Sequence, residues 1–362
     1  MHHPLSLKTD LNSLRLWFLS SKRDFPWRNT PTPYAVWVSE IMLQQTVASV
    51  VVPYFIRWMD KFPTIKALAE ADIADVIKLW EGLGYYSRAR NLYAGARYIV
   101  EHFEGELPSD AKALQSIKGI GPYTLGAILS FAFHQKAAAV DGNVIRVLAR
   151  YYGIEEDISL AITRKKIEVI AQTMLPDFEP WVISEALIEL GATICTPRKP
   201  QCFTCPLRTG CLAYQQSKVE KIPHKSAKIK YEPLYRSVVV IIHQDKVLLQ
   251  KVGSGKIMSD LYEFPYFESD EAGHSIDHIV QLVSDKLQLN GSFHSLFKLV
   301  KHSFTRFRVQ LRPIKLEVFE HATVKDHTWI PINKLITLPF SSGHRRIVAQ
   351  ILDDVSLTLT NP

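Results

Sequence analysis

The sequence predicts two domains of different class, an all-α module followed by an α+β module. Three observations predict this division: apolar residues three and four apart up to about position 211, β-branched runs of period two from position 237, and a basic stretch without periodicity between them. The 362 residues suffice for two or three domains at ~100–200 residues each. We therefore predict domains at 1–211 and 235–362, joined by a linker at 212–234.

Helices are expected throughout the first module, because Pro, Gly, Ser and Asp separate segments whose apolar residues recur at helical spacing. The predicted helices cover residues 36–51, 65–80, 89–102, 111–117, 125–133, 144–152, 164–174 and 181–190.

The second module begins with a predicted β-hairpin. Residues 237–242 and 246–250 are rich in Val, Ile and Leu, and a His-Gln-Asp turn separates them. Further segments resemble strands or helices by the same criteria. The strand-like segments are 296–301, 306–311 and 314–319, and the helix-like segments are 276–287 and 344–352.

The composition is that of an ordinary globular protein. With 47% hydrophobic and 22% charged residues, it argues against fibrous, collagen-like and disordered classes. No apolar run approaches the ~18 residues of a membrane-spanning helix, so we expect no membrane contact. Residues 1–10 have no long apolar stretch followed by small residues, and we expect a cytoplasmic protein, associated with the nucleoid in a bacterium.

The net charge of +7 is concentrated around the linker. Residues 212–236 carry six Lys and Arg against two acidic residues, over half of the excess. Two interpretations have equal weight: a solvated connector, or a connector that lies along a phosphate backbone.

All four cysteines lie within one stretch of 17 residues, at Cys195, Cys202, Cys205 and Cys211. In a cytosolic chain such clustering predicts a metal site. One short knuckle with two intermediate gaps favours an iron–sulfur cluster over zinc, which usually takes two knuckles. Four reduced core cysteines are the alternative, but the neighbouring prolines make this segment a loop.

A tight turn between two short helices is predicted around Gly119 and Gly121. Asp110 can cap the first helix and Pro122 suits the first position of the second. The exposed backbone N–H groups of such a turn bind phosphate without reading sequence. A lone Gly-x-Gly is often only a turn, but the flanking proline strengthens the phosphate-binding interpretation.

Two carboxylates, Glu40 and Asp141, are candidates for an acid and an anion. Glu40 falls within the apolar stripe of Val36, Leu43 and Val47, where burial would raise its pKa toward neutrality and suit a general acid. On the residues alone, a Glu at the edge of the stripe that reaches solvent is the favoured reading. Asp141 precedes a helix, so it is either a simple N-cap or a carboxylate kept ionised by the helix N-terminus. One raised and one lowered pKa would make a pair suited to glycosidic bond cleavage.

Residues from about 24 to 211 resemble the helix-hairpin-helix DNA glycosylases of the endonuclease III superfamily. Their motifs stand in the order of the MutY-type adenine DNA glycosylases, and the second module resembles the Nudix-like domain of that family. The motifs are Phe25-Pro-Trp-Arg28, Trp37-Val-Ser-Glu-Ile-Met-Leu-Gln-Gln-Thr46, Trp80-Glu-Gly-Leu-Gly-Tyr-Tyr-Ser-Arg88, Ile117-Lys-Gly-Ile-Gly-Pro-Tyr-Thr124, Val140-Asp-Gly-Asn-Val-Ile-Arg146 and the cysteine loop.

The resemblance implies removal of adenine mispaired with 8-oxoguanine or guanine in double-stranded DNA, by a monomer that holds a [4Fe-4S] cluster. It implies that Glu40 protonates adenine N7 and that Asp141 stabilises the oxocarbenium ion or forms a covalent adduct. Tyr123 and Asn143 would position the nucleotide and the Asp141 carboxylate, and Arg28 would support the adenine pocket. The residues that would wedge into the duplex and contact the opposite base are Gln45, Thr46, Leu83 and Tyr85.

Tyr123 stands where bifunctional glycosylase/lyases of the superfamily carry a lysine. A phenol cannot form a Schiff base, so the resemblance implies a monofunctional enzyme. The rival hypotheses are a lyase acting on oxidised pyrimidines and a non-catalytic iron–sulfur protein that binds DNA and senses redox state.

The Nudix-like module lacks the glutamate-rich helix that holds Mg²⁺ in Nudix hydrolases, so we expect no hydrolysis there. The segment from His302 to Arg306 aligns with the family's His-x-Phe-Ser-His loop, which contacts 8-oxoguanine. Phe304 and the hydroxyl of Thr305 keep that pattern, and Arg306 replaces the second histidine with a side chain suited to a phosphate or base contact.

Overall fold

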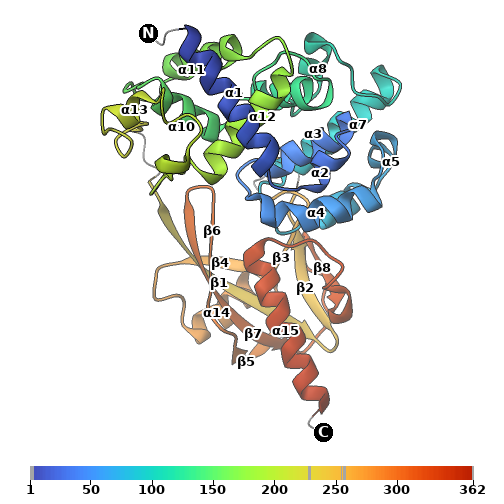
Figure 1. The fold of residues 1–362 in the computed structure, drawn as a ribbon. Coiled ribbons are helices and arrows are strands. Elements are labelled where there is room, and N and C mark those ends of the chain that lie inside the picture. The colour runs from blue at the N-terminus through green and yellow to red at the C-terminus, as the bar shows by residue number, and fades with distance from the viewer. Residues whose placement is uncertain (1–3, 227–229, 254, 256–257, 361–362) are drawn as a thin grey trace. The chain divides into compact units, whose positions relative to one another are not determined.

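The computed structural model describes residues 4–226, 230–253, 255 and 258–360. Its backbone contacts divide the chain into two compact units. The helical unit comprises Met1–Glu70 and Asn91–Lys228, and the sheet unit comprises Ala71–Arg90 and Ile229–Pro362. Figure 1 shows the helices of the first unit and the mixed sheet of the second, as the sequence predicts for the two classes.

The helical unit is built of α-helices with one π-helical segment and one 3₁₀ turn in the described residues. Its elements are α1 (Pro4–Ser21), α2 (Pro26–Asn29), α3 (Pro33–Leu43), α4 (Ala48–Lys61), α5 (Ile65–Ala69), most of α7 (Ser87–His102), α8 (Ala111–Ser116), α9 (Pro122–Ala127), the π-helical η1 (Ile128–Ala132), α10 (Gly142–Tyr151), α11 (Ala161–Met174), α12 (Pro180–Thr193), η2 (Cys202–Thr204) and α13 (Leu212–Gln215).

Two of the predicted helices are each split in the structure. The segment 36–51 breaks after Leu43, where Gln45 takes a left-handed backbone (φ 60°), and resumes at Ala48. The segment 65–80 breaks before Asp72, whose carboxylate accepts a hydrogen bond from the Ala74 N–H and starts α6 (Ile73–Leu79). Apolar periodicity continues across both breaks, so it could not reveal them.

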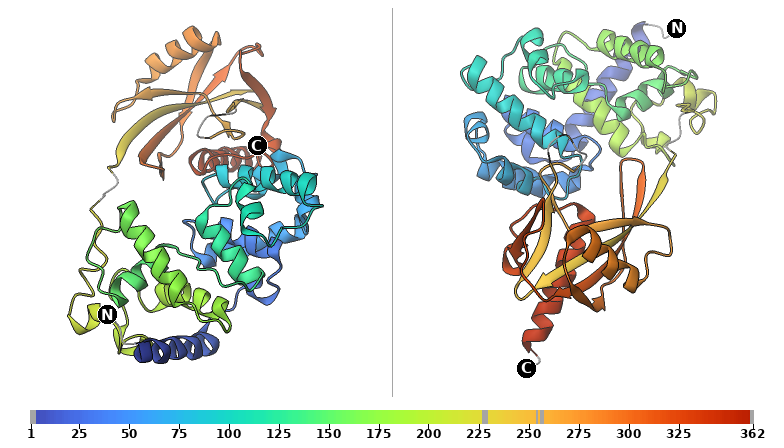
Figure 2. Two further views of the ribbon diagram at one scale, coloured as in Figure 1. Left: turned by 90° about the horizontal axis from the view of Figure 1, so that it is seen from above. Right: turned by 180° about the vertical axis from the view of Figure 1, so that it is seen from behind.

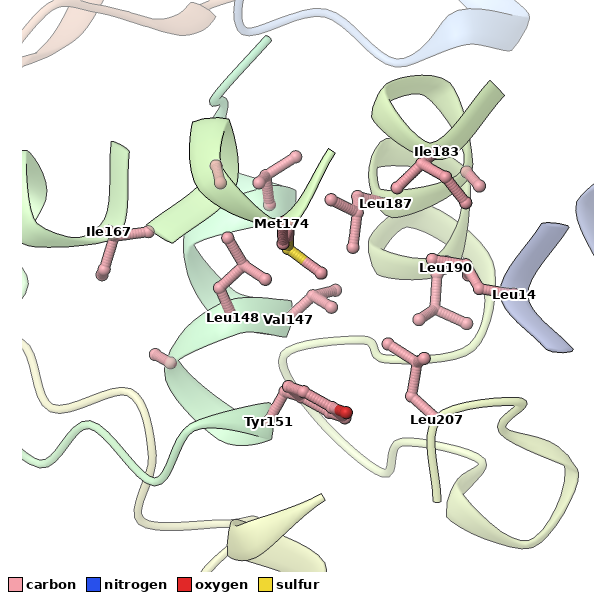
Figure 3. Packing of buried hydrophobic residues seen from close by; sticks show 14 of the residues in the cluster. Leu14, Val147, Leu148, Tyr151, Ile167, Met174, Ile183, Leu187, Leu190 and Leu207 are labelled. Atoms are coloured by element: carbon pink, nitrogen blue, oxygen red, sulfur yellow. The ribbon is translucent and has the colours of Figure 1, made fainter. Parts of the chain in front are cut away.

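A hydrophobic core joins α1, α10, α11 and α12 (Figure 3). Leu148 and Leu190 are fully buried there, together with Leu14 of α1. The sequence prediction missed α1, although it supplies one wall of this core. The same core holds the start of α10, the helix that follows Asp141.

The sheet unit has one eight-stranded mixed sheet. Its main path has the strand order β3-β2-β1-β7-β5, and β4, β6 and β8 pair with β1, β7 and β2, respectively. The long strands β1 and β7 run parallel, and the other pairs are antiparallel. The strands are β1 (Glu232–His243), β2 (Lys246–Lys251), β3 (Tyr262–Glu263), β4 (Tyr266–Ser269), β5 (Gly291–Leu296), β6 (Val300–Phe304), β7 (Phe307–Val318) and β8 (His327–Pro331); the other elements are α14 (Ile276–Leu287), η3 (Ile332–Lys334) and α15 (Ser342–Thr360).

The two faces of this sheet pack against different helices, as the left panel of Figure 2 shows. Val238 and Val240 of β1 face α15, whereas Val239 and Ile241 face α14. Burial on both faces explains why β1 reads as a continuous run of β-branched residues rather than an alternating one. The predicted hairpin of β1 and β2 and the predicted helix 276–287 are confirmed.

Three strand predictions are wrong in their boundaries. The segment 296–301 contains the end of β5 and the start of β6, and the segments 306–311 and 314–319 form the single strand β7. Pro313 suggests a break, since proline cannot donate to a ladder. It lies where the neighbour of β7 changes from β6, last paired at Leu311, to β5, first paired at Ile314, so its missing N–H costs no ladder bond.

Part of the predicted linker packs on the helical unit. Ile222 is buried, its carbonyl accepts a hydrogen bond from Arg150 Nε at 2.8 Å, and the His224 carbonyl accepts one from the Ile158 N–H at 3.0 Å. The prediction of a linker at 212–234 also includes residues 227–229, which lie outside the described residues. Across the part of the chain that the structure describes, none of the helices is both long and apolar enough to span a membrane.

Candidate functional site

Helix α3 carries Glu40 into the interior of the helical unit. The helix starts at Thr32, whose hydroxyl accepts a hydrogen bond from the Ala35 N–H at 3.2 Å, with Pro33 in its first turn. Every residue from Tyr34 to Met42 is buried, so the helix has no solvent face over this stretch. Glu40 is 6% exposed, and the favoured expectation that it reaches solvent at the edge of the stripe is wrong.

Glu40 is hydrogen-bonded to Tyr123. Tyr123 follows Pro122 at the start of α9, and its hydroxyl donates to Glu40 Oε2 at 2.5 Å. The pKa of Glu40 is raised to about 7, chiefly by burial; the negative charges of Asp141 and Glu185 add to the rise, and the Tyr123 hydrogen bond and the Arg28 charge oppose it. Burial also raises the pKa of Tyr123 well above its ordinary value. A neutral phenol therefore holds a carboxyl group that gains or loses its proton near neutrality.

Asp141 is the N-cap of α10. Its Oδ1 accepts hydrogen bonds from the N–H groups of Asn143 and Val144, both at 2.8 Å, and its Oδ2 accepts one from Asn143 Nδ2 at 2.6 Å. Burial nevertheless raises the pKa of Asp141, because desolvation outweighs these three donors. The sequence-based expectation of a lowered pKa is therefore wrong in direction.

Hydrogen bonds from Arg146 fix the side chain of Asn143. Arg146 Nη2 donates to Asn143 Oδ1 at 2.8 Å and to the Gly191 carbonyl at 2.8 Å. Arg146 Nε donates to the Cys195 carbonyl at 2.7 Å. The amide of Asn143 thus has one orientation, with its NH₂ directed at Asp141.

Arg28 of α2 joins two glutamates of α12. Its Nε donates to Glu185 at 3.0 Å and its Nη2 to Glu189 at 3.0 Å, while Arg23 also binds Glu189. Glu189 is 1% exposed, and its two arginine partners keep its pKa low despite its burial. Burial raises the pKa of Glu185.

These side chains line one cavity of about 850 Å³ in the helical unit. His134 and Trp181 form a second part of its wall, with ring centroids 4.3 Å apart in a stacked arrangement. A cavity lined by a flat aromatic pair and by buried carboxylates suits a planar, hydrogen-bonding ligand. The predicted residues that line this cavity are Arg28, Glu40, Gln45, Thr46, Tyr123, Asp141 and Asn143.

Gln45 and Thr46 reach the cavity because the chain breaks between α3 and α4. The Thr46 N–H donates to the Leu43 carbonyl at 3.2 Å, which closes a turn around Gln45. The preceding Gln44 donates through Nε2 to the Thr124 hydroxyl at 3.3 Å. This bond ties the loop to α9, the helix of Tyr123.

The predicted turn at Gly119 and Gly121 joins α8 to α9. Ile117 and Ile120 are buried and anchor it, whereas both glycines are exposed. Gly119 has a φ of 94°, and a side chain there would collide with Asn91. Asp110 caps α8 through the Ala113 N–H, as the sequence predicts.

The four cysteines line a separate pocket in the helical unit. Arg150, 2% exposed, donates through Nη1 to Cys195 Sγ at 3.4 Å, and backbone N–H groups point at the sulfurs of Cys205 and Cys211. Burial raises the pKa of the Cys205 thiol to about 12. Among the described residues, no three His, Cys, Asp or Glu side chains are arranged as a ready-made site for a metal ion. Four sulfurs with a buried arginine and N–H donors nonetheless fit, in kind, a negatively charged sulfur-ligated group.

Other predicted residues lie in the sheet unit. Leu83 is buried at 5% exposure, whereas Tyr85 is 46% exposed and has a φ of 47°. Thr305 and Arg306 form the two-residue turn between β6 and β7, and Phe304 pairs with Phe307 across it. Arg306 forms an ion pair with Glu232 at 3.2 Å.

Sequence reasoning missed Glu185 and Arg146 as parts of the site. Glu185 belongs to an i, i+4 pair with Glu189 inside an otherwise apolar helix, and this pair was the available signal. Arg146 follows Asn143 by one turn of α10, which places both on one helix face.

Family models match both parts of the chain. A family model of HhH-GPD superfamily base excision DNA repair proteins matches residues 38–173, and a NUDIX domain model matches residues 237–350. A solved structure of a thermostable thymine-DNA glycosylase is 30% identical, has a TM-score of 0.54, and covers 59% of this chain and 98% of that chain.

Curated relatives extend the similarity over both units. A protein of Buchnera aphidicola subsp. Acyrthosiphon pisum (strain APS), named adenine DNA glycosylase, is 33% identical over 299 residues, 83% of this chain and 83% of that protein. The mouse protein of the same name is 44% identical over 214 residues, 57% of this chain and 42% of the mouse protein. The chain therefore spans less than half the length of that mammalian relative.

Proposed function

The chain belongs to the adenine DNA glycosylase family, and from this premise we propose that it hydrolyses the N-glycosidic bond of adenine mispaired with 8-oxoguanine or guanine. The observation that carries the proposal is the buried Glu40–Tyr123 pair, which shares one cavity with Asp141. An acid with a pKa near neutrality beside a second carboxylate is the arrangement that glycosidic cleavage needs.

Glu40 would act first, as the general acid. Adenine is a poor leaving group unless a ring nitrogen is protonated, and we assign that proton transfer, to N7, to the Glu40 carboxyl group. Its pKa of about 7 leaves a substantial protonated fraction at neutral pH. The Tyr123 hydroxyl holds the carboxyl in place, and the resulting carboxylate can then accept a proton from water that attacks the sugar.

Asp141 would stabilise the positive charge that develops on the sugar. Its three hydrogen bonds and its place at the N-terminus of α10 favour the charged form, against the cost of burial. The carboxylate then either stabilises the oxocarbenium ion electrostatically or bonds to the sugar carbon. Asn143 positions one Asp141 oxygen.

The enzyme would be monofunctional. Forming a Schiff base with the abasic sugar needs an amine, and the residue beside Glu40 is the phenol of Tyr123. We therefore expect an abasic site as the product, without strand cleavage.

The DNA contacts would come from both units, with the protein acting as a monomer. In the helical unit, the turn at Gly119 and Gly121 would bind a phosphate through backbone N–H groups, and Gln45 and Thr46 would contact the base opposite adenine. In the sheet unit, Leu83 and the exposed Tyr85 would wedge into the duplex and fill the gap left by the flipped nucleotide. The turn of Phe304, Thr305 and Arg306 would recognise 8-oxoguanine.

We further propose that Cys195, Cys202, Cys205 and Cys211 hold a [4Fe-4S] cluster. The support is that the four sulfurs line one pocket, with the Arg150 guanidinium there to offset negative charge. When bound, the cluster would cross-link residues 195–211 and so brace the Cys195 carbonyl, which binds Arg146. Iron and acid-labile sulfide analysis of anaerobically purified protein separates this proposal from zinc, which would give one zinc per chain and no sulfide.

The decisive experiment uses duplexes with one adenine opposite 8-oxoguanine, guanine or thymine. We expect abasic product with the first two, detected as strand breaks only after alkali, and none with adenine opposite thymine. Borohydride should trap no covalent complex. Strand cleavage without alkali, or a trapped complex, would support a lyase instead, and binding without turnover would leave only a DNA-binding role.

A further inference from the structure

We infer that the sheet unit fixes the shape of the exposed loop around Tyr85, and that this anchoring supports insertion of Tyr85 into the duplex. The inference deepens the proposed function and rests on it. Its basis is that residues 71–90 pack as part of the sheet unit, although they interrupt the helical unit in sequence. Two residues that bracket the loop, Glu81 and Tyr86, both bind the segment 335–345.

Glu81 is the first anchor and has a bidentate partner. Arg345 of α15 donates through Nε to Glu81 Oε1 at 2.7 Å and through Nη2 to Oε2 at 2.9 Å. The Phe340 N–H also donates to Glu81 Oε1, at 3.1 Å. The carboxylate side chain is 14% exposed, so this fork is shielded from water and has the geometry that makes arginine–carboxylate pairs strong.

Lys78 and Tyr86 extend the anchor on both sides of Glu81. Lys78 Nζ donates to Glu81 Oε2 at 2.6 Å and to the carbonyls of Ile336 and Leu338 at 2.7 and 3.0 Å. The Tyr86 hydroxyl donates to the Phe340 carbonyl at 3.2 Å. Contacts therefore hold the chain both before and after residues 82–85.

The loop between the anchors has an unusual backbone. Gly82, Gly84 and Tyr85 all have positive φ values, of 106°, 70° and 47°. Arg88 Nη2 donates to the carbonyls of Leu83 and Gly84, and Trp80 Nε1 donates to the Gly84 carbonyl. These bonds hold the loop from within, and Tyr85 is left at its exposed tip.

A loop held in this way needs little further ordering when Tyr85 enters the duplex. Extruding a base from the stack already costs unpairing and unstacking energy, and a mobile wedge would add the entropy of its own ordering. The sheet unit would thus act on base extrusion through Glu81 and Tyr86, separately from any contact of its own with the opposite base.

The direct test breaks the fork with Arg345→Met in the full chain. The matched control is Arg312→Met in β7, where the guanidinium binds the Glu271 carbonyl. Hydrogen–deuterium exchange of peptides within 78–90 should speed up roughly tenfold or more in Arg345→Met and stay at the wild-type rate in Arg312→Met. Unchanged exchange in Arg345→Met would overturn the inference.

Single-turnover rates then connect the anchor to function. With adenine opposite 8-oxoguanine, Arg345→Met should be slower by roughly tenfold. With adenine opposite an abasic-site analogue, where no pairing has to break, its rate should stay nearer that of wild type. Equal losses on both duplexes would contradict a role in extrusion.

The Tyr86→Phe variant tests whether the effects of Arg345→Met come from a general loss of folding. It removes only the hydroxyl that binds Phe340, so it should show a smaller change of the same kind with an unaltered melting temperature. If the wild type excised adenine from neither duplex, the proposed function would fail, while the exchange experiment would still report on the anchor.

Discussion

The surroundings of Glu40 and of Asp141 differ sharply, although both carboxyl groups are buried in one cavity. Glu40 projects from the middle of a fully buried helix and accepts one hydrogen bond, from a neutral phenol. Asp141 stands at a helix N-terminus and accepts three hydrogen bonds. Burial raises the pKa of both groups, to about 7 in Glu40.

The difference teaches that the number of hydrogen-bond donors, rather than the degree of burial, determines which of two buried carboxyl groups acts as the acid and which as the anion. With one donor, Glu40 keeps its proton near neutrality and suits an acid. With three donors and the helix dipole, Asp141 is expected to lose its proton at a lower pH than Glu40 and to suit an anion.

Removing the acid should have the largest effect. Glu40→Gln keeps the size of the side chain and an acceptor for Tyr123, but it has no proton to give, so single-turnover excision should fall by roughly 10²–10⁴. In wild type the rate should decline as the pH rises through about 7, where Glu40 loses its proton.

Glu168→Gln provides the control for this variant. Glu168 forms an exposed ion pair with Lys165 on α11, and its change should leave both the rate and the pH profile in place. A Glu40→Gln enzyme with wild-type turnover, or a wild-type rate that is flat from pH 6 to 8, would contradict the assignment of the acid.

The same substitution should stabilise the protein at high pH. The pKa of Glu40 is about 7 in the folded chain against an ordinary 4.5, so its contribution to stability is complete below pH 4.5 and is lost as the pH rises through 7. Above pH 7 the wild type carries a buried charge that costs up to about 3 kcal/mol, which glutamine avoids.

Thermal melting at pH 5 and pH 8.5 measures this difference. Glu40→Gln should melt close to wild type at pH 5 and several degrees higher at pH 8.5. An equal shift at the two pH values would mean that packing, not ionisation, distinguishes the variant.

The fold was largely predictable because its signals are local. Helical spacing and β-branched runs identified both classes, and Asp110, Asp141 and Pro122 marked helix starts correctly. Where the prediction failed, the cause was tertiary. The break at Gln45 and the continuity of β7 through Pro313 depend on neighbours distant in sequence, which no single segment reports.

The site was predictable as a set of residues but not as an environment. Resemblance supplied Glu40, Tyr123 and Asp141 by position, yet the residues alone favoured an exposed Glu40 and a lowered pKa for Asp141. Both errors have one physical origin. Desolvation depends on what covers a group from other helices, and sequence periodicity describes only the helix that carries it.

Removing one hydrogen-bond donor from Asp141 should bring its pKa closer to that of Glu40. Asn143→Ala removes the bond to Oδ2 and leaves Arg146 without its acceptor there, while the two backbone donors remain. Excision should slow by roughly tenfold to 10²-fold. The low-pH limb of the rate profile should move up, because the pKa of Asp141 should rise further. Loss of rate with an unmoved low-pH limb would show that Asn143 acts on the substrate instead.

The smallest expected effect concerns the segment that leads to Asp141. The Gln172 side chain of α11 accepts a hydrogen bond from the Ala138 N–H at 3.0 Å and donates one to the Lys136 carbonyl at 2.8 Å, and the Ser184 hydroxyl accepts from the Ala139 N–H at 3.1 Å.

The backbone before Glu40 is held by its own helix, so the position of Asp141 should be the more sensitive of the two to contacts from other helices. Gln172→Ala should reduce kcat a few-fold with little change in KM, whereas Gln172→Glu should restore the Ala138 bond and part of the rate. Because Gln172 only positions the segment, the pH at which Glu40 titrates should not move. A shift of the limb near pH 7 in Gln172→Ala would mean that the two carboxyl groups are positioned together rather than separately.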